Sequence, residues 1–256
     1  MNRPSVRIVG VHGNGGGASR FARMAAHVPD DVELHAVTLP GFSTVPRDPA
    51  LRTLADYADR LGEMLDAGVE AAGHTVLLGH GIGGSIALDL VSRRPDLVDG
   101  LILHAPVGAS LDTRLFPRIM SSPTVRALVK RVISSPLPRP LLRRVFFPQG
   151  APKDILDRFF DEYRHCAAFG DMFELINRPW FDGVQPILDV PAVLLWGADD
   201  RVLRSGQADE FKVKVPGAET VVRDGWDHFP MIEQPGEYAD EIVAMARRLV
   251  SAKRSA

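Results

Sequence analysis

Apolar residues cluster in short runs at intervals along the chain. Each run is rich in valine, isoleucine and leucine, and the runs are continuous rather than alternating. Such runs are typical of strands in a parallel sheet that is buried on both faces. We therefore predict strands at residues 6–13, 32–41, 75–80, 98–107, 191–200 and 220–228.

Between these runs, apolar residues recur every three to four positions, which is the period of a helix with one buried face. Leu54, Tyr57, Leu61 and Leu65, for example, share one side of such a helix. Strands that alternate with helices predict an α/β fold in which a mostly parallel, doubly wound sheet is covered on both faces. The helical segments fall at residues 18–28, 53–69, 85–94 and 237–250.

This alternation fails between Gly108 and Pro186. The first half of the segment is dense in proline and has no strand-like run, and the second half is helical and aromatic. We interpret residues 108–185 as a mostly helical cap inserted over the carboxyl end of the sheet. The core then consists of residues 1–107 and 186–256.

Composition is that of a globular protein with a sizeable core, because 45% of the 256 residues are hydrophobic and 24% are charged. The formal net charge of -2 argues against a binder of polyanions.

Cys166 is the one cysteine, so no disulfide forms within the chain, which fits a reducing cytoplasm. No secretory signal and no run of 18 apolar residues is found. We expect a cytoplasmic protein that does not enter a membrane.

Five glycine-rich or acidic motifs follow predicted strands, and their order is informative. They read VHGNGGG (11–17), LPGFS (39–43), GHGIGG (79–84), WGADDRVL (196–203) and GWDHFPMIEQP (225–235). In this order they resemble the α/β-hydrolase superfamily over almost the whole chain. That family carries an oxyanion loop, a nucleophile on a sharp strand-to-helix elbow, an acid and then a histidine.

The resemblance implies a catalytic pair of Asp200 and His228. Asp199 is a competitor for the acid, but the spacing from Gly197 favours Asp200. The carboxylate would accept the Nδ1 proton of His228 and leave Nε2 as a general acid or base near neutral pH.

The resemblance also implies an oxyanion hole built from the backbone N–H groups of Asn14 and Ile82. Preorganised donors of this kind stabilise a developing negative oxygen by about 3–4 kcal/mol each. Both are backbone groups, so they do not depend on the side chain at the elbow.

The departure from the family lies at the elbow itself, where Gly81 stands in place of a serine, cysteine or aspartate. Loss of the serine costs a hydrolase about a million-fold in turnover. Hydrolysis through an acyl-enzyme is therefore not expected. Ser85 is no substitute, because it falls one turn into the following helix.

Three interpretations of Gly81 stay open. The retained pair of Asp200 and His228 favours a site that has been reused for other chemistry. Alternatively, glycine relieves the strained torsions of an elbow that is no longer catalytic, which would leave a ligand-binding protein. A third alternative is an introduced serine-to-glycine change in a serine hydrolase.

The reused site predicts cofactor-free proton transfer as a lyase or cyclase. His228 would remove a proton from a small, largely apolar carbonyl compound, and the oxyanion hole would hold the resulting enolate. The alternative reaction is hydrolysis by a water that His228 activates directly. No metal-ligand spacing and no dinucleotide fingerprint occurs, so no metal and no cofactor is expected.

A substrate pocket is expected around the motifs and under the cap. The candidates are His12, Gly13, His80, Trp226, Phe229 and Trp180. Among them, His12 also fits a structural role in its turn, and His80 is expected to point away from the site.

The cap is strongly basic between residues 114 and 153, where nine lysines and arginines occur without an acidic residue. This pattern fits a solvated cationic face. The alternative is a docking surface for an anionic substrate or an acidic carrier protein. Nucleic acid is not expected, since no binding motif accompanies the charges.

Overall fold

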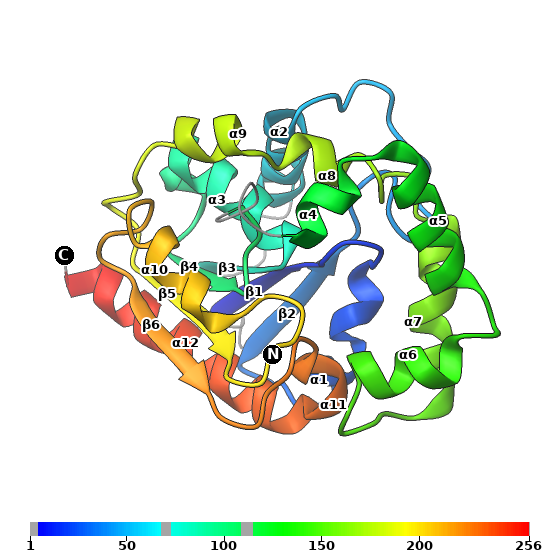
Figure 1. Ribbon diagram of the computed structural model, residues 1–256. Helices are drawn as coiled ribbons and strands as arrows, with labels where there is room; N and C mark the ends of the chain where they lie inside the picture. Colours follow the sequence, from blue (N-terminus) through cyan, green and yellow to red (C-terminus); the bar gives the residue numbers. More distant parts are fainter. Residues whose placement is uncertain (1–4, 68–72, 109–114, 256) are drawn as a thin grey trace.

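The computed structural model of the chain describes residues 5–67, 73–108 and 115–255. These residues form one sheet of six parallel strands with helices on both faces (Figure 1). The predicted α/β class with a parallel, doubly wound sheet is confirmed. In spatial order the strands are β2 (Val32–Val37), β1 (Val6–Val11), β3 (Thr75–His80), β4 (Gly100–His104), β5 (Ala192–Gly197) and β6 (Glu219–Arg223).

The strand order creates a topological switch beside β1. The chain passes from β1 to β2 on one side and later crosses back to β3 on the other side. In open parallel sheets, ligands bind in the crevice at the carboxyl ends of the strands at such a switch. The loop after β1 and the turn after β3 both leave the sheet there, so the residues that follow these two strands meet.

Helices cover the two faces of the sheet in separate layers (Figure 1). On one face α2 (Leu54–Asp66) packs against α3 (Ile82–Arg93). On the other face α12 (Pro235–Ser255) packs against β4 and contacts α1 (Ala22–Ala25) and α11 (Pro230–Glu233). Each layer buries one side of the strands, which explains why the strand sequences are continuously apolar.

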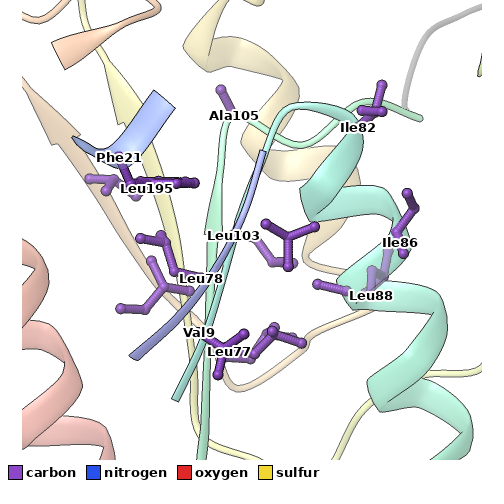
Figure 2. Packing of buried hydrophobic residues seen from close by; sticks show 14 of the residues in the cluster. Val9, Phe21, Leu77, Leu78, Ile82, Ile86, Leu88, Leu103, Ala105 and Leu195 are labelled. Atoms are coloured by element: carbon purple, nitrogen blue, oxygen red, sulfur yellow. The ribbon is translucent and has the colours of Figure 1, made fainter. Parts of the chain in front are cut away.

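The division of the core is visible between neighbouring strands. In Figure 2, Leu77 and Leu103 point toward α3, whereas Leu78 and Leu195 point to the opposite side of the sheet. Ile86 of α3 fills the first layer, and all five side chains are fully buried.

Glycines allow helices to approach the sheet closely at two crossings. A Cβ on Gly79 of β3 would lie 2.5 Å from the carbonyl oxygen of Gly83 in α3. A Cβ on Gly100 of β4 would lie 2.7 Å from the Leu249 Cβ of α12. Both distances are shorter than van der Waals contact, so only glycine fits at these positions.

Several predicted boundaries differ from the structure. The helix predicted over residues 18–28 is a 3-10 turn (Ala18–Phe21) followed by α1, which ends at Ala25 because Pro29 disfavours helical torsions at Val28. Helix α3 begins at Ile82 rather than at Ser85. Strand β6 lies at the edge of the sheet, and its side chains are exposed or half-buried. Its short apolar run therefore does not indicate a strand that is buried on both faces.

The described part of the segment between β4 and β5 contains six helices, joined by turns and loops, and no strand. They are α4 (Leu115–Met120), α5 (Pro123–Ser134), α6 (Arg139–Phe146), α7 (Lys153–His165), α8 (Met172–Leu175) and α9 (Arg178–Gly183). The segment from α4 to α7 lies beside the sheet in Figure 1. Residues 109–114 of the predicted cap, and residues 1–4, 68–72 and 256 of the predicted core, lie outside the described residues.

Candidate active site

The elbow is a sharp turn between β3 and α3 with Gly81 at its tip. Its torsions are φ 57° and ψ -120°, a conformation that L side chains rarely adopt and that glycine accepts without steric cost. The Gly81 N–H donates to the His104 carbonyl at 3.0 Å, which fixes the turn. Among the described residues beyond its chain neighbours, a Cβ built on Gly81 would come within 4 Å only of the Cα of Gly13, at 3.5 Å. The tip of the elbow is therefore open to a small group.

A buried carboxylate holds the imidazole of His228. The Nδ1 atom lies 2.8 Å from Oδ2 of Asp200, whose Oδ1 accepts the N–H groups of Val202 and Leu203 at 2.8 and 2.7 Å. His228 and Asp200 are 6% and 4% exposed, whereas the competing Asp199 is exposed. The acid loop thus offers one buried carboxylate to the histidine, and it belongs to Asp200.

The pKa of Asp200 reflects this environment. Burial would raise the pKa of the carboxyl group, but the charge and hydrogen bond of His228, together with the N–H groups of Leu203 and Val202, outweigh burial. The pKa of Asp200 is therefore held below its ordinary value, and the group is a carboxylate at neutral pH. In this state it orients His228 and stabilises an imidazolium.

The ring of His228 lies against the elbow. His80, which directly precedes Gly81, donates from Nε2 to the His228 carbonyl at 3.1 Å, and the centroids of the two rings are 4.6 Å apart. The Asp227 carboxylate accepts the His228 N–H at 2.7 Å. Nε2 of His228 makes no hydrogen bond to a residue that the structure describes, so this atom can exchange a proton with a ligand.

The two predicted oxyanion residues flank the same tip. Ile82 is the first residue of α3, where an N–H has no partner within its helix. Asn14 lies in the loop after β1, and its side chain donates to the Phe169 carbonyl at 3.1 Å. In the described part of the chain neither backbone N–H has an acceptor. The loop after β1 approaches the elbow closely at Gly13, because a Cβ there would lie 2.9 Å from Nδ1 of His80.

His12 is buried with both ring nitrogens bound to the main chain. Nδ1 donates to the Gly13 carbonyl at 2.9 Å, and Nε2 accepts the Leu39 N–H at 3.2 Å. Burial lowers the pKa of His12 to about 4, so the ring is neutral. This geometry matches the structural alternative for His12, and its place in a pocket stays a prediction.

The three aromatic pocket candidates occupy different surroundings. Phe229 contacts His228 and the rings of Phe147 and Phe159 in the cap, at centroid distances of 4.7, 5.3 and 5.0 Å. Trp226 is fully buried, and its indole N–H donates to Glu237 of α12 at 2.9 Å. Trp180 is half-buried over Gly108 and donates to Asp89 of α3 at 2.8 Å. Phe229 is therefore the one of these three with contacts to both the histidine and the cap, and pocket roles for all three stay predictions.

Two groups beside the site were missed by the sequence reasoning. His104 packs against His80 with ring centroids 4.8 Å apart, and its Nδ1 lies 3.1 Å from the Tyr238 hydroxyl. Arg20 and Glu162 form a buried ion pair between the loop after β1 and the cap. His104 could have been found because its strand aligns with β3. No local pattern links Arg20 with Glu162, which are far apart in sequence.

Ser85 is engaged elsewhere. Its hydroxyl donates to the Val107 carbonyl and lies 3.5 Å from the Gly81 carbonyl, inside the first turn of α3. It does not replace a nucleophile at the tip.

Two surface hollows lie outside the elbow. One, of about 470 Å³, borders the acid loop from Ala198 to Gly206. The other, of about 410 Å³, lies on the cap between α6 and α7. Neither of the two is lined by Gly81 or His228.

Most of the basic cap residues are used within the protein. Arg114 lies outside the described residues, and five of the other eight bind acidic side chains or a carbonyl: Arg126, Lys130, Arg139, Arg143 and Lys153. Arg118, Arg131 and Arg144 are exposed and have no acidic partner in the described part of the chain. The free positive charge of the cap is thus smaller than the sequence suggests.

Within the described residues, no cluster of three histidine, cysteine or acidic side chains could hold a metal ion. Over the same residues, no helix combines the length and apolar character needed to cross a bilayer.

Comparison with known proteins agrees with the fold. The family model described as the alpha/beta hydrolase family matches residues 8–241. The chain belongs to the α/β-hydrolase family.

Relatives known by sequence are distant but extend over most of the chain. A pimeloyl-[acyl-carrier protein] methyl ester esterase of Aromatoleum aromaticum is 25% identical over 93% of this chain and 96% of its own length. A protein of the same name from Neisseria meningitidis is 22% identical over 90% of this chain and 88% of its own. An uncharacterised protein of Mycobacterium tuberculosis is 25% identical over 91% of this chain and 73% of its own.

Solved structures share the fold. An esterase from Exiguobacterium antarcticum superposes with a TM-score of 0.77 at 15% identity, and covers 96% of this chain and 93% of its own. The Bacillus megaterium epoxide hydrolase gives 0.74 at 15% identity, with 94% and 93% covered. At these identities the likeness concerns the fold alone.

Proposed function

We propose that the protein is an enzyme of the hydrolase family that uses His228 and Asp200, with the backbone N–H groups of Asn14 and Ile82, for cofactor-free proton transfer. His228 Nε2 removes a proton next to a carbonyl group, and the two N–H groups hold the enolate oxygen. Elimination or ring closure follows without a covalent intermediate. The substrate is a small, largely apolar carbonyl compound.

The observation that carries this proposal is the 2.8 Å hydrogen bond from His228 to the buried Asp200, beside an elbow that lacks a nucleophile. A carboxylate-braced imidazole has a proton to give or take at Nε2. Without a hydroxyl at residue 81, that proton is exchanged with the ligand instead of with the enzyme.

A second candidate reaction is direct hydrolysis by an activated water. The open tip at Gly81 supports it, because a water there would have His228 and the oxyanion N–H groups as polar partners. The names of the relatives support it as well, since esterases cleave carbonyl esters with water. This reaction keeps the overall outcome of an esterase while omitting the acyl-enzyme.

For the partner, we propose an acidic carrier protein or an anionic substrate that approaches the cap at Arg118, Arg131 and Arg144. These three exposed arginines have no acidic partner in the described part of the chain. Two relatives are named as esterases of a pimeloyl-[acyl-carrier protein] methyl ester, which agrees with this choice.

The test is exchange of carbon-bound protons in D₂O. The protein is incubated with a panel of aryl ketones and β-hydroxy acyl thioesters, and deuterium at the carbon next to the carbonyl is followed by NMR. We expect exchange or turnover with at least one compound, and a loss of about 10³-fold or more in His228→Ala, since that variant lacks its general base. Exchange that persists in His228→Ala would contradict the proposal.

Companion measurements separate the alternatives. Incorporation of ¹⁸O from labelled water into an acid product, without a burst of alcohol release, favours direct hydrolysis. A ligand that binds equally to wild type and His228→Ala, with no turnover, favours the binding protein. Gly81→Ser with ordinary esterase rates on p-nitrophenyl butyrate supports a serine hydrolase in which the serine was replaced.

A further inference from the structure

A buried ion pair joins the cap to the loop after β1, outside the residues assigned above. Arg20 lies six residues after Asn14, and its Nη1 atom is 3.4 Å from Oε2 of Glu162 in α7. The two side chains are 4% and 7% exposed. Removing one partner of such a pair leaves a buried charge without compensation, so each of the two side chains depends on the other.

The guanidinium of Arg20 also binds the main chain of both segments, the loop after β1 and helix α7. Nη2 donates to the Gly15 carbonyl in the loop and to the Phe159 carbonyl in α7, each at 3.4 Å. The guanidinium carbon stacks 3.6 Å from the centroid of the Phe159 ring. Arg20 therefore holds the residue next to Asn14 and the cap helix at the same time.

Glu162 completes the attachment on the other side. Its Oε1 accepts the hydroxyls of Ser19 and Ser43, which belong to the two loops of the core that face the cap. The adjacent Tyr163 ring occupies the place where a Cβ of Gly15 would lie, and Gly15 has a φ of 79°. The loop that carries Asn14 is thus shaped on its cap side by α7.

We propose that Arg20 and Glu162 are positioning residues for the oxyanion hole, and that α7 is a fixed wall of the site instead of a movable lid. The guanidinium of Arg20 holds the Gly15 carbonyl, two peptide units after the peptide that carries the Asn14 N–H, and so restrains the loop in which that N–H lies. The Phe159 ring, packed between Arg20 and Phe229, carries the same restraint to the ring beside His228. The inference rests on the proposed use of the Asn14 N–H as an oxyanion donor.

The test measures the loop directly and needs no turnover. The Gly16 N–H donates to the Gly13 carbonyl at 3.2 Å, so its hydrogen exchange reports whether the loop keeps its shape. The variants are Arg20→Lys, Glu162→Gln and the double variant Arg20→Met/Glu162→Gln, which removes both charges together. The control is Arg47→Met, because Arg47 also pairs a core loop with the cap, through Asp171 at 2.7 Å.

We expect the Gly16 N–H to exchange about ten-fold faster or more in the double variant, because local opening is no longer opposed by the ion pair. Amides of β3 and β4 keep wild-type protection, and Arg47→Met leaves Gly16 unchanged. Equal Gly16 exchange in wild type and the double variant would overturn the proposal. So would the same acceleration in Arg47→Met.

A kinetic measurement adds a second criterion. In the Gly81→Ser background with p-nitrophenyl butyrate, the double change is expected to lower kcat about 10- to 100-fold and leave KM within about three-fold, since an oxyanion donor acts in the transition state. A change in KM with kcat retained counts against the positioning role. If Gly81→Ser is inert, exchange at Gly16 alone decides, and a failure of the proposed proton transfer leaves that result unaffected.

Discussion

The chemistry of single side chains in this site depends on which atoms are already occupied. His12 has both nitrogens bound to the main chain, whereas His228 has Nδ1 on Asp200 and Nε2 without a described partner. Of these two buried histidines, His228 alone has an atom ready for a ligand. Burial and hydrogen bonding therefore separate a structural histidine from a candidate general base.

Substitution of Asp200 tests this distinction. Asp200→Asn keeps the shape but presents an amide to Nδ1, so the imidazole loses its preferred tautomer and the stabilisation of its charged form. We expect any His228-dependent exchange or turnover to fall by about 10³- to 10⁴-fold, the size seen when a buried triad aspartate is changed. The rate is measured by deuterium exchange on a compound that the wild type accepts.

Asp199→Asn is the matched control, because it changes the exposed neighbour by the same chemistry. It is expected to retain the wild-type rate within about two-fold, as surface changes of this kind are close to neutral. A comparable loss in both variants would mean that the acid loop acts through its net charge, not through the hydrogen bond of Asp200.

The resemblance of the loop motifs to the α/β-hydrolase family predicted Asp200 and His228, because each lies in a short loop after a strand whose sequence pattern can be recognised. It could not predict the ion pair of Arg20 and Glu162, since that contact depends on how the cap folds back over the core. Trp226 shows the same limit, because closeness in sequence to a site residue does not determine where a side chain points. It lies two residues before His228, but its indole N–H donates to Glu237 of α12.

Among the elements, β3 and α3 pack closely against each other on either side of the elbow. Gly79 lies on β3 against Gly83 and Gly84 of α3, and the contact is between backbones. This explains why α3 begins at Ile82, ahead of the predicted start. Two glycines lower helix propensity and hide the first turn in the sequence, but tertiary packing of the close crossing outweighs that cost.

Gly79→Ala tests how far this crossing depends on the missing side chain. The added Cβ would lie 2.5 Å from the Gly83 carbonyl oxygen, and a backbone atom cannot move aside as the end of a side chain can. We expect the free energy of unfolding to fall by about 3 kcal/mol or more, at the upper end of overpacking costs. Gly217→Ala is the control in the same urea titration, because its added Cβ would meet no atom within 4 Å in the described part of the chain beyond its chain neighbours. A Gly79→Ala protein as stable as this control would show that α3 can shift away from β3.

For the molecule as a whole, the position of the site follows from the strand order. Because β1 and β3 are neighbours, the residues that follow them, Asn14 and Gly81, lie close together, and the acid and histidine loops approach from β5 and β6. The continuous apolar strands predicted a parallel sheet, but their sequences do not show which strands lie next to each other in it. The exposed edge position of β6 could not be predicted, because burial of a short strand depends on which strands lie beside it.

Stability against acid is a property of the entire fold, and the buried histidines determine its direction. Burial lowers the pKa of His12 to about 4 and of His104 to about 3, and it holds the pKa of His80 well below the ordinary value. In the unfolded chain all three take up a proton near pH 6.5. Glu233 has the opposite effect, because burial raises its pKa to about 7 and the folded protein keeps its proton.

Around pH 5.5 the unfolded chain therefore binds three histidine protons more and one glutamate proton fewer than the folded protein. Since the unfolded state binds about two protons more in total, stability must fall as the pH is lowered, by about 3 kcal/mol per pH unit. Urea titrations between pH 7 and pH 5 measure this slope. His104→Gln, which can still bind the Tyr238 hydroxyl, is expected to halve it, whereas His35→Gln at an exposed site leaves it unchanged. A slope near zero, or one that His104→Gln does not alter, would mean that these rings accept protons within the fold and that the interior beneath the elbow is open to water.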